Sequence, residues 1–359
     1  MREIGPHEQF LERGLTKMKI LVAGGGGFIG GHLVSSLIAD GHQVRSIDRK
    51  PLEEWYQVHN QAENIVSDLQ YRDSAYSAVV DIDRVFNLAC DMGGMGFIEN
   101  NKALCMLSVL INTNLLEASK DAGVERYFYA SSACVYAAGK QTDPNVTALA
   151  EGDAYPAMPE DGYGWEKLFS ERMCRHFTED FGLETRVARY HNVYGPDGTW
   201  TGGREKAPAA ISRKVAEAAI SGNHEIGVWG DGLQTRSFMY VDDCVKGTKM
   251  LMDSDVREPI NIGSAELISI NDLTDMVAGI AGIEITRKHD LTAPQGVRGR
   301  NSDNTLIQEL MGWEPSISLL DGMTETYRWI ADQVEQTIEV DVTDGSAEVI
   351  EVTERAKAA

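Results

Sequence analysis

The sequence predicts an α/β protein: a Rossmann-type, doubly wound parallel sheet with a smaller C-terminal substrate lobe interleaved with the last sheet elements. Three observations support this fold class. Short apolar runs alternate with helical stretches in the first half of the chain, a glycine-rich turn follows the first run, and near residue 195 the composition changes. Strands that alternate with helices at this spacing are typical of a parallel sheet covered on both faces.

The expected elements follow one another along the chain. The predicted strands are the runs "KILVA" (19–23), "QVRSIDR" (43–49), "NIVSD" (64–68), "RVFNLAC" (84–90), "RYFYASSACVY" (126–136) and "ETRVARYHNVYG" (184–195). Between them lie helical stretches such as "CMLSVLINTNLLEASKDAG" (105–123) and "GWEKLFSERMCRHFTEDFG" (164–182). Because crossovers between parallel strands are right-handed, a doubly wound sheet is the expected arrangement.

The composition changes at "GPDGTWTGGREKAPAAISRK" (195–214), which is rich in glycine, proline and cations. We therefore expect an N-terminal arm (1–17), an NAD-binding Rossmann domain (18–194, completed by 236–263), and a substrate lobe (195–235 and 264–334). The end of the chain (335–359) has many acids and weak patterning, which is typical of a flexible tail.

Charge and cysteine content exclude several classes of protein. Lys and Arg number 33 against 55 Asp and Glu, for a net charge of -22, which disfavours nucleic-acid binding over a broad surface. Five scattered cysteines without a CxxC motif indicate reduced thiols in a cytoplasmic protein. The histidine spacing predicts no metal site, and no apolar run is long enough to span a membrane.

A glycine-rich turn joins the first strand to the first helix. Gly24, Gly27 and Gly30 allow positive φ, close approach of a pyrophosphate and tight packing of helix on strand. Phe28 and Ile29 begin the helix, whose free N–H groups and partial positive charge suit phosphates. The turn therefore predicts a dinucleotide cofactor.

An acidic residue follows at the expected distance. Asp48 closes the second strand 18 residues after Gly30 (48 − 30), where a carboxylate accepts from the adenosine ribose. A carboxylate repels a 2′-phosphate, so NAD is favoured over NADP, although the adjacent Arg49 weakens this argument. Asp68 is a candidate contact to the adenine edge.

"YGWEK" places Tyr163 and Lys167 four residues apart, on one face of a predicted helix. A neighbouring ammonium favours the tyrosine phenolate, which can remove a hydroxyl proton while a hydride leaves for nicotinamide. Ser132 lies at the end of a strand 31 residues upstream (163 − 132). Together with the glycine turn, these residues predict an NAD-dependent redox site.

Several longer motifs carry a resemblance: "NLACDMGGMGF" (87–97), "YASSACVY" (129–136), "RYHNVYGPDGTWTGGREKAPAA" (189–210), "WGDGLQTRSF" (229–238) and "GVRGRNSDN" (296–304). Over residues 18–334 the chain resembles the extended short-chain dehydrogenases/reductases that modify nucleotide sugars. Within that family it is most similar to the GDP-mannose 3,5-epimerases. The resemblance implies catalytic NAD, a GDP-mannose substrate and a homodimer.

The same resemblance implies residue roles. Ser132, Tyr163 and Lys167 would serve the redox step, and Cys134 and Lys206 would form the acid–base pair for inversion. Ser132, Cys134 and Lys206 would also touch the sugar, with further substrate contacts from Gly93, Asn192, Glu205, Lys214, Gln234, Arg236 and Arg300. Clustered cations in a chain this acidic suit a diphosphate, although Arg213 and Arg298 are equally compatible with solvated charges.

Cys134, two positions after Ser132, decides between reactions. On its own, a cysteine after a strand is more often a small packing residue, the role assigned here to Cys90 and Cys174. In the similar 4,6-dehydratases the two positions after the catalytic hydroxyl residue carry an Asp–Glu pair that acts in water elimination. Here they are Ala133 and Cys134. A thiolate is a competent base, so Cys134 is predicted to be a reagent.

Oxidation at C4 would make the hydrogens at C3 and C5 acidic through an enolate, which suits inversion by such a pair. Two alternatives remain at the level of sequence. The first is a 4-epimerase or 4,6-dehydratase of another nucleotide sugar, and the second is a cofactor-sensing binding protein that kept the fold without the chemistry.

Overall fold

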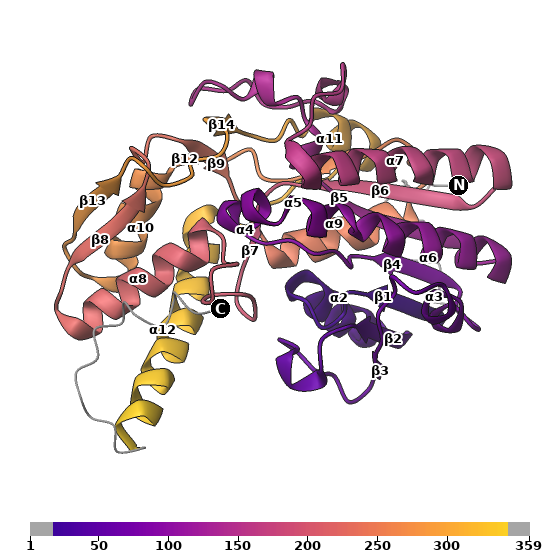
Figure 1. Ribbon diagram of the computed structural model, residues 1–359, viewed down its shortest axis with the longest axis horizontal. Coiled ribbons are helices and arrows are strands. Elements are labelled where there is room, and N and C mark those ends of the chain that lie inside the picture. Colours follow the sequence, from indigo (N-terminus) through magenta and orange to yellow (C-terminus); the bar gives the residue numbers. More distant parts are fainter. Residues whose placement is uncertain (1–16, 344–359) are drawn as a thin grey trace, which may run out of the picture.

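The computed structural model describes residues 17–343, and its largest unit is a seven-stranded parallel sheet (Figure 1). The strand order is β11-β6-β5-β4-β1-β2-β3, so the chain winds outward in both directions from the boundary between β1 and β4. The predicted doubly wound sheet is confirmed. Its strands are β1 Lys19–Ala23, β2 Gln43–Asp48, β3 Glu63–Val66, β4 Arg84–Asn87, β5 Arg126–Ser132, β6 Glu184–Tyr190 and β11 Ile260–Ile262.

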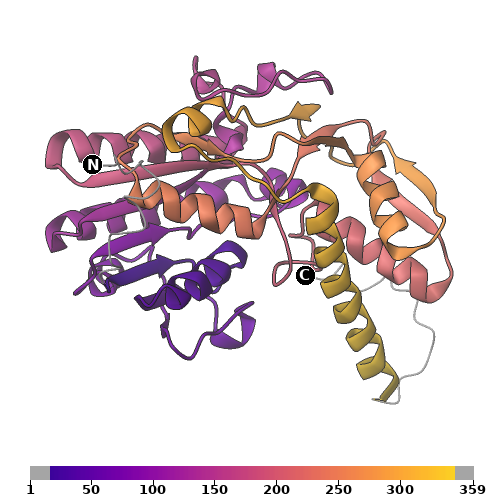
Figure 2. The ribbon, with the colours of Figure 1, turned by 180° about the vertical axis from the view of Figure 1, so that it is seen from behind.

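Helices cover both faces of this sheet. α2 (Phe28–Ala39) and α9 (Val241–Asp253) pack together on one face, whereas α3 (Arg72–Ala78), α6 (Ser108–Ala122) and α7 (Asp161–Phe181) cover the other (Figures 1 and 2). In β1, Ile20 and Val22 enter the core beneath α2, and Leu21 and Ala23 enter the core beneath α6. Because side chains alternate along a strand and both faces are buried, β1 forms a continuous apolar run.

A smaller lobe follows residue 194. It contains α8 (Ala207–Ser221), α10 (Ile270–Ala281) and α12 (Leu319–Thr343), the parallel pair β8 (Glu225–Trp229) and β13 (Thr286–Asp290), and a three-stranded sheet. That sheet has the order β12 (Leu267–Ser269), β9 (Thr235–Ser237) and β14 (Gly299–Arg300). The lobe has its own core, built from Ile211, Val215, Ile226, Phe238, Leu273, Val277, Leu319 and Met323.

Short elements connect these units. They are η1 (Leu52–Glu54), α4 (Met95–Asn100), α5 (Lys102–Met106), η2 (Ala133–Val135), η3 (Ala138–Lys140), η4 (Glu151–Ala154), β7 (Val193–Tyr194), β10 (Met239–Tyr240) and α11 (Thr305–Met311). β7 and β10 pair in parallel where the chain passes between the sheet and the lobe.

Two segments differ from the predicted boundaries. α11, expected in the lobe, packs on β11, and Ile307 and Trp313 are buried in the main core. α12 continues to Thr343, so it includes residues 335–343 of the predicted tail. Before Glu335, Ile330 and Val334 of α12 pack against Ala216 of α8. The rest of the predicted tail, and the predicted arm up to residue 16, lie outside the described residues.

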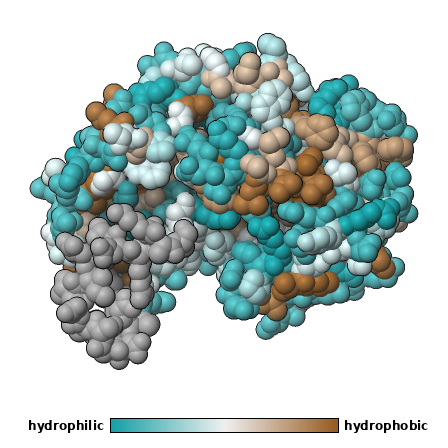
Figure 3. Space-filling model, in the orientation of Figure 1, coloured by the Kyte–Doolittle hydropathy of each residue, from teal (hydrophilic) through white to brown (hydrophobic). Residues whose placement is uncertain are grey.

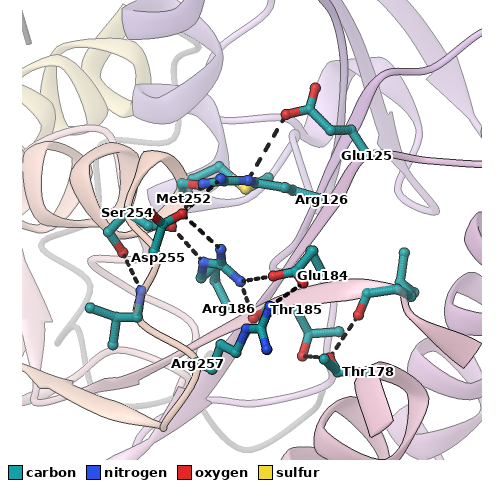
Figure 4. Close-up of polar contacts among 12 residues, drawn as sticks. Glu125, Arg126, Thr178, Glu184, Thr185, Arg186, Met252, Ser254, Asp255 and Arg257 are labelled. Atoms are coloured by element: carbon teal, nitrogen blue, oxygen red, sulfur yellow. Dashed lines mark hydrogen bonds and ion pairs between the residues drawn. The ribbon is translucent and has the colours of Figure 1, made fainter. Parts of the chain in front are cut away.

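Two arginines hold the end of α9 at the amino edge of the sheet (Figure 4). Arg126 Nη1 donates to the carbonyls of Met252 (2.9 Å) and Ser254 (2.7 Å), and Arg186 Nε donates to Ser254 (2.8 Å). The last carbonyls of a helix have no partner within it, so these contacts satisfy them. They also attach α9 to β5 and β6.

A buried ion pair holds α7 against the other edge of the sheet. Arg189 of β6 makes two hydrogen bonds to the Glu171 carboxylate of α7, at 2.9 and 2.7 Å, and both residues are at most 3% exposed. Ser131 of β5 donates to the same carboxylate. Three adjacent elements are therefore joined at one point.

Arg189→Met is expected to lower the free energy of unfolding by about 3–5 kcal/mol, because it leaves the Glu171 carboxylate buried and unpaired. The matched control is Arg175→Met on α7, which removes a half-exposed pair with Glu179 and should leave the free energy of unfolding nearly unchanged. Urea unfolding followed by circular dichroism measures both values. Equal losses in the two variants would contradict the importance of burial.

Candidate active site

A cavity of about 770 Å³ lies at the carboxyl edge of the sheet, between the sheet and the lobe. Its wall includes the glycine turn, the ends of β2, β4 and β5, and the segment between β7 and α8. Ligands of doubly wound sheets bind at this edge, where the strand order reverses. The volume is in the range of small-molecule sites.

The glycine turn has the geometry that a pyrophosphate needs. Gly24 has φ +83°, and its N–H donates to the Ile47 carbonyl (2.7 Å). A Cβ on Gly30 would lie 2.0 Å from the Gly24 carbonyl oxygen, so only glycine fits there. Gly27 precedes α2, and Phe28 and Ile29 form its first turn, whose N–H groups have no helical partner. All five residues line the cavity.

Asp48 and Asp68 also line the cavity, next to the turn. Asp48 ends β2 and accepts from the Lys50 N–H (3.1 Å). Arg49 Nη2 donates to the carboxylate of Asp91 (2.7 Å), which is 5% exposed. The cation that weakened the preference for NAD is therefore paired elsewhere.

Tyr163 and Lys167 lie one turn apart on α7, and Ser132 ends β5 beside them. Tyr163 and Ser132 both line the cavity. Burial, reinforced by the Cys90 and Cys134 sulfurs, raises the pKa of Tyr163 well above its usual value, and the Ser132 contact opposes this. Burial therefore favours the neutral phenol.

Lys167 is held by two groups that sequence reasoning missed. Its ammonium lies 3.6 Å from the buried Glu166 carboxylate. Burial alone would lower the pKa of Lys167, but Cys90 and Glu166 raise it overall. Cys90, predicted to be a packing residue, also lines the cavity. Its position three residues after the end of β4 was the available signal.

Cys134 lies in η2, 8% exposed, in an apolar cluster with Tyr163. Its N–H donates to Ser132 Oγ (3.2 Å), and Arg300 Nη1 donates to its sulfur (3.5 Å). Lys206 precedes α8 and lines the cavity from the lobe. Burial lowers the pKa of Lys206, while the Cys134 and Cys90 sulfurs oppose that shift. The sheet and the lobe thus contribute one group each.

The remaining predicted substrate residues fall into two sets. Gly93 and Asn192 line the cavity, and Asn192 donates to the Ser237 carbonyl (3.0 Å). The others are outside its wall and are engaged with protein groups: Glu205 with Gly203 and Arg213, Lys214 with Gly227, Gln234 with Trp229, Arg236 with Thr235 and Gln295, and Arg300 with Gln141 and Cys134.

Two of these residues, Gln234 and Arg236, have buried polar groups that could contact a ligand. Gln234 is 5% exposed, and its side-chain oxygen has no hydrogen-bond partner. Burial lowers the pKa of Arg236 to about 10. A buried polar group without a partner is costly, so such groups are candidates for ligand contacts.

Contacts between the domains close over the cavity. Tyr56 hydrogen-bonds with Thr199 of the β7–α8 segment. Arg204 of that segment lies over the Phe97 ring (3.8 Å) and 3.6 Å from Asp91. Asp91 therefore lies between Arg49 and Arg204, a role that its place in the chain does not reveal.

Across residues 17–343, no cluster of three or more His, Cys, Asp or Glu side chains could hold a metal ion. No helix in that range combines the length and apolar character needed to cross a membrane.

Comparison with known proteins identifies the family. The profile of the NAD dependent epimerase/dehydratase family matches residues 20–263. The chain belongs to this family.

Relatives with full-length similarity include GDP-mannose 3,5-epimerase 1 of Oryza sativa subsp. indica, which is 47% identical over 93% of this chain and 88% of its own. GDP-mannose 3,5-epimerase of Arabidopsis thaliana is 46% identical over 89% and 84%. Among solved structures, UDP-glucose 4-epimerase of Thermotoga maritima with UDP-glucose has a TM-score of 0.79 at 26% identity, covering 88% of this chain and 100% of that one.

The protein is therefore an NAD-dependent enzyme of the epimerase/dehydratase family, and the cavity fits that cofactor. The turn leaves no room for a Cβ at Gly30, as expected where the third glycine of a dinucleotide-binding turn packs the helix closely against the first strand. When bound, NAD would be held by the turn and the α2 N-terminus, with Asp48 at the adenosine ribose.

Gly30→Ala is expected to weaken NAD binding at least about 100-fold, because the added Cβ displaces the Gly24 backbone. The matched control is Gly31→Ala in the next position. Its Cβ would meet only the Gln57 side chain, at 3.1 Å, so NAD affinity should change less than about threefold. Calorimetric titration of NAD-free protein measures both. Similar losses in the two variants would contradict the proposal that NAD binding depends on the close packing of Gly30 against Gly24.

Proposed function

We propose that this enzyme is a GDP-mannose 3,5-epimerase, which converts GDP-mannose to GDP-L-galactose and GDP-L-gulose. The observation that supports this most directly is the arrangement of Cys134 and Lys206 around the Ser132–Tyr163 pair. The thiol follows β5 in η2, the amine precedes α8 in the lobe, and the Cys134 sulfur acts on the charge of Lys206. Simple 4-epimerases need no such pair, because they return the hydride to the other face of the ketone.

The redox step uses the groups on α7 and β5. NAD, when bound, supplies transient oxidation at sugar C4, and its positive charge favours the phenolate of Tyr163. Tyr163 takes the proton of the C4 hydroxyl and later returns it to the same oxygen. Ser132 donates a hydrogen bond to that oxygen, and Lys167, held by Glu166 and Cys90, provides positive charge near the phenolate.

Inversion uses Cys134 and Lys206. A ketone at C4 makes the hydrogens on C3 and C5 acidic, because the resulting carbanion is an enolate. The Cys134 thiolate accepts a proton from one face and becomes a thiol. The Lys206 ammonium gives a proton to the opposite face and becomes an amine. The lowered pKa of Lys206 makes this donation easier. The pair keeps the same total charge throughout.

Gly93, Asn192, Glu205, Lys214, Gln234 and Arg236 are the proposed substrate contacts. Among them Gln234 has an unpartnered buried oxygen, and the Arg236 guanidinium is a bidentate donor suited to a diphosphate. Glu205, Lys214, Gln234 and Arg236 belong to the lobe, whereas Gly93 follows β4 and Asn192 follows β6. The cofactor would occupy the sheet side.

Cys134→Ala is expected to lower inversion by about 10²–10⁴-fold while C4 oxidation continues, because only the base is removed. Enzyme, GDP-mannose and NAD are incubated in deuterated water, and the recovered sugar is analysed by NMR and mass spectrometry. Wild type should incorporate deuterium at C3 and C5. Cys174→Ala, a change in the core beneath α6, is the control and should keep wild-type labelling.

Wild-type labelling in the Cys134→Ala variant would remove the thiol from the mechanism. Label at C5 alone in wild type would narrow the reaction to a single inversion. Turnover of another nucleotide sugar, without turnover of GDP-mannose, would make the enzyme a 4-epimerase or dehydratase instead.

We further propose that the enzyme is a homodimer joined through α5, α6 and α7. Large apolar side chains are exposed on this face: Met106, Leu107, Leu110, Trp165 and Phe169, each 42–57% exposed. Figure 3 shows hydrophobic residues gathered where α6 and α7 face the viewer. An apolar patch on neighbouring helices is typical of an interface, and a second copy brings an identical patch.

Trp165→Glu together with Phe169→Glu is expected to weaken the dimer at least about tenfold, because two charges would be buried. Leu320→Glu, on the exposed face of α12, is the control and should leave the dimer intact. Light scattering coupled to size exclusion measures the mass. A monomeric wild type at micromolar concentration would contradict the proposal.

A cytoplasmic location completes the proposal. All five cysteines are free thiols. Reduced cysteines are typical of proteins in a reducing compartment.

A further inference from the structure

Arg300 is buried beside Cys134. It belongs to β14 and is 4% exposed, two nitrogens of its guanidinium donate hydrogen bonds, and the third faces a carboxylate. Nε donates to Gln141 Oε1 (2.7 Å), Nη1 donates to Cys134 Sγ (3.5 Å), and Nη2 pairs with Glu160. This burial leaves almost no guanidinium surface for a substrate diphosphate.

The partners of Arg300 are themselves fixed by the backbone around Cys134. Gln141 is 1% exposed and donates to the Tyr136 carbonyl (3.3 Å). The Glu160 N–H donates to the Cys134 carbonyl (3.0 Å). Gln141 and Glu160, which are both attached to the backbone around Cys134, therefore hold the guanidinium from two sides. In this position one of its N–H groups points at the Cys134 sulfur.

We propose that Arg300 stabilises the thiolate of Cys134, with Glu160 and Gln141 as positioning residues that hold the guanidinium against the sulfur. This rests on the proposed function, in which Cys134 is the base. It replaces the diphosphate contact that the family resemblance implies for Arg300.

The charges around the sulfur support this assignment. Arg300 is the cation in direct contact, while Lys206 and Arg236 act on Cys134 from farther away. Tyr163 and the Cys90 thiol, which also face the cluster, are neutral because burial raises the pKa of each. Glu160 is the carboxylate on the far side of the guanidinium, where its negative charge opposes a second anion at the sulfur.

Opposite effects are therefore expected from the two charged residues. Arg300→Gln removes the cation and should slow alkylation of Cys134 at neutral pH at least about tenfold, because the thiolate is the nucleophile. Glu160→Gln keeps an acceptor for Arg300 but removes the negative charge, so alkylation should become at least about threefold faster. If Arg300 and Glu160 had purely structural roles, both variants would alkylate Cys134 at the wild-type rate or more slowly.

The experiment uses the NAD-loaded enzyme and iodoacetamide, with the Cys134 peptide quantified by mass spectrometry. Calorimetry with GDP measures the diphosphate site in the same variants, and affinity should change less than about threefold. Arg287→Gln is the control: it lies in the same lobe, is paired with half-exposed Asp275, and should alter neither rate nor affinity.

Unchanged alkylation with at least tenfold weaker GDP binding in Arg300→Gln would make Arg300 a diphosphate ligand and overturn the proposal. If that variant does not fold, Glu160→Gln decides alone, and a rate at or below wild type would overturn it. Alkylation needs no turnover, so it reports on Arg300 even if GDP-mannose proves not to be the substrate.

Discussion

The buried pair of Arg189 and Glu171 is the interaction on which the position of α7 depends. It joins β6 to α7, and Ser131 adds β5 to the same carboxylate. Tyr163 and Lys167 lie on that helix, and Ser132 follows Ser131 directly. A helix packed on a sheet only by apolar contacts could slide by a fraction of a turn, but a bidentate ion pair has one geometry. The relative positions of Tyr163, Lys167 and Ser132 are therefore set by an ion pair that takes no part in the proposed chemistry.

Charged groups recur in apolar surroundings throughout the site. Lys167 lies near Glu166 and Cys90, Lys206 is partly buried at the edge of the lobe, and Arg300 is shared by Glu160 and Cys134. Removal from water makes each of these charges more sensitive to its neighbours. The lowered pKa of Lys206 suits proton donation in the proposed inversion.

The interleaving of the two domains makes this site possible. The chain leaves the sheet after β6, enters the lobe through the segment that carries Arg204 and Lys206, and returns for α9 and β11. Tyr56 with Thr199, and Asp91 with Arg204, attach that segment to the cofactor side. Groups from two separate cores can therefore face one sugar from opposite sides, as an inversion requires.

The sequence by itself determined the doubly wound sheet, the glycine turn and the Tyr163–Lys167 spacing, because each depends on residues close together in the chain. It also indicated Cys134 and Lys206 through motifs shared with a family. It misplaced the 305–313 segment, since apolar spacing predicts a helix but not the surface on which that helix packs. Only the tertiary structure decided the partners of Arg49, Lys167 and Arg300. Arg49 meets Asp91 42 positions away and Arg300 meets Cys134 166 positions away, and side-chain directions at such separations are set by packing.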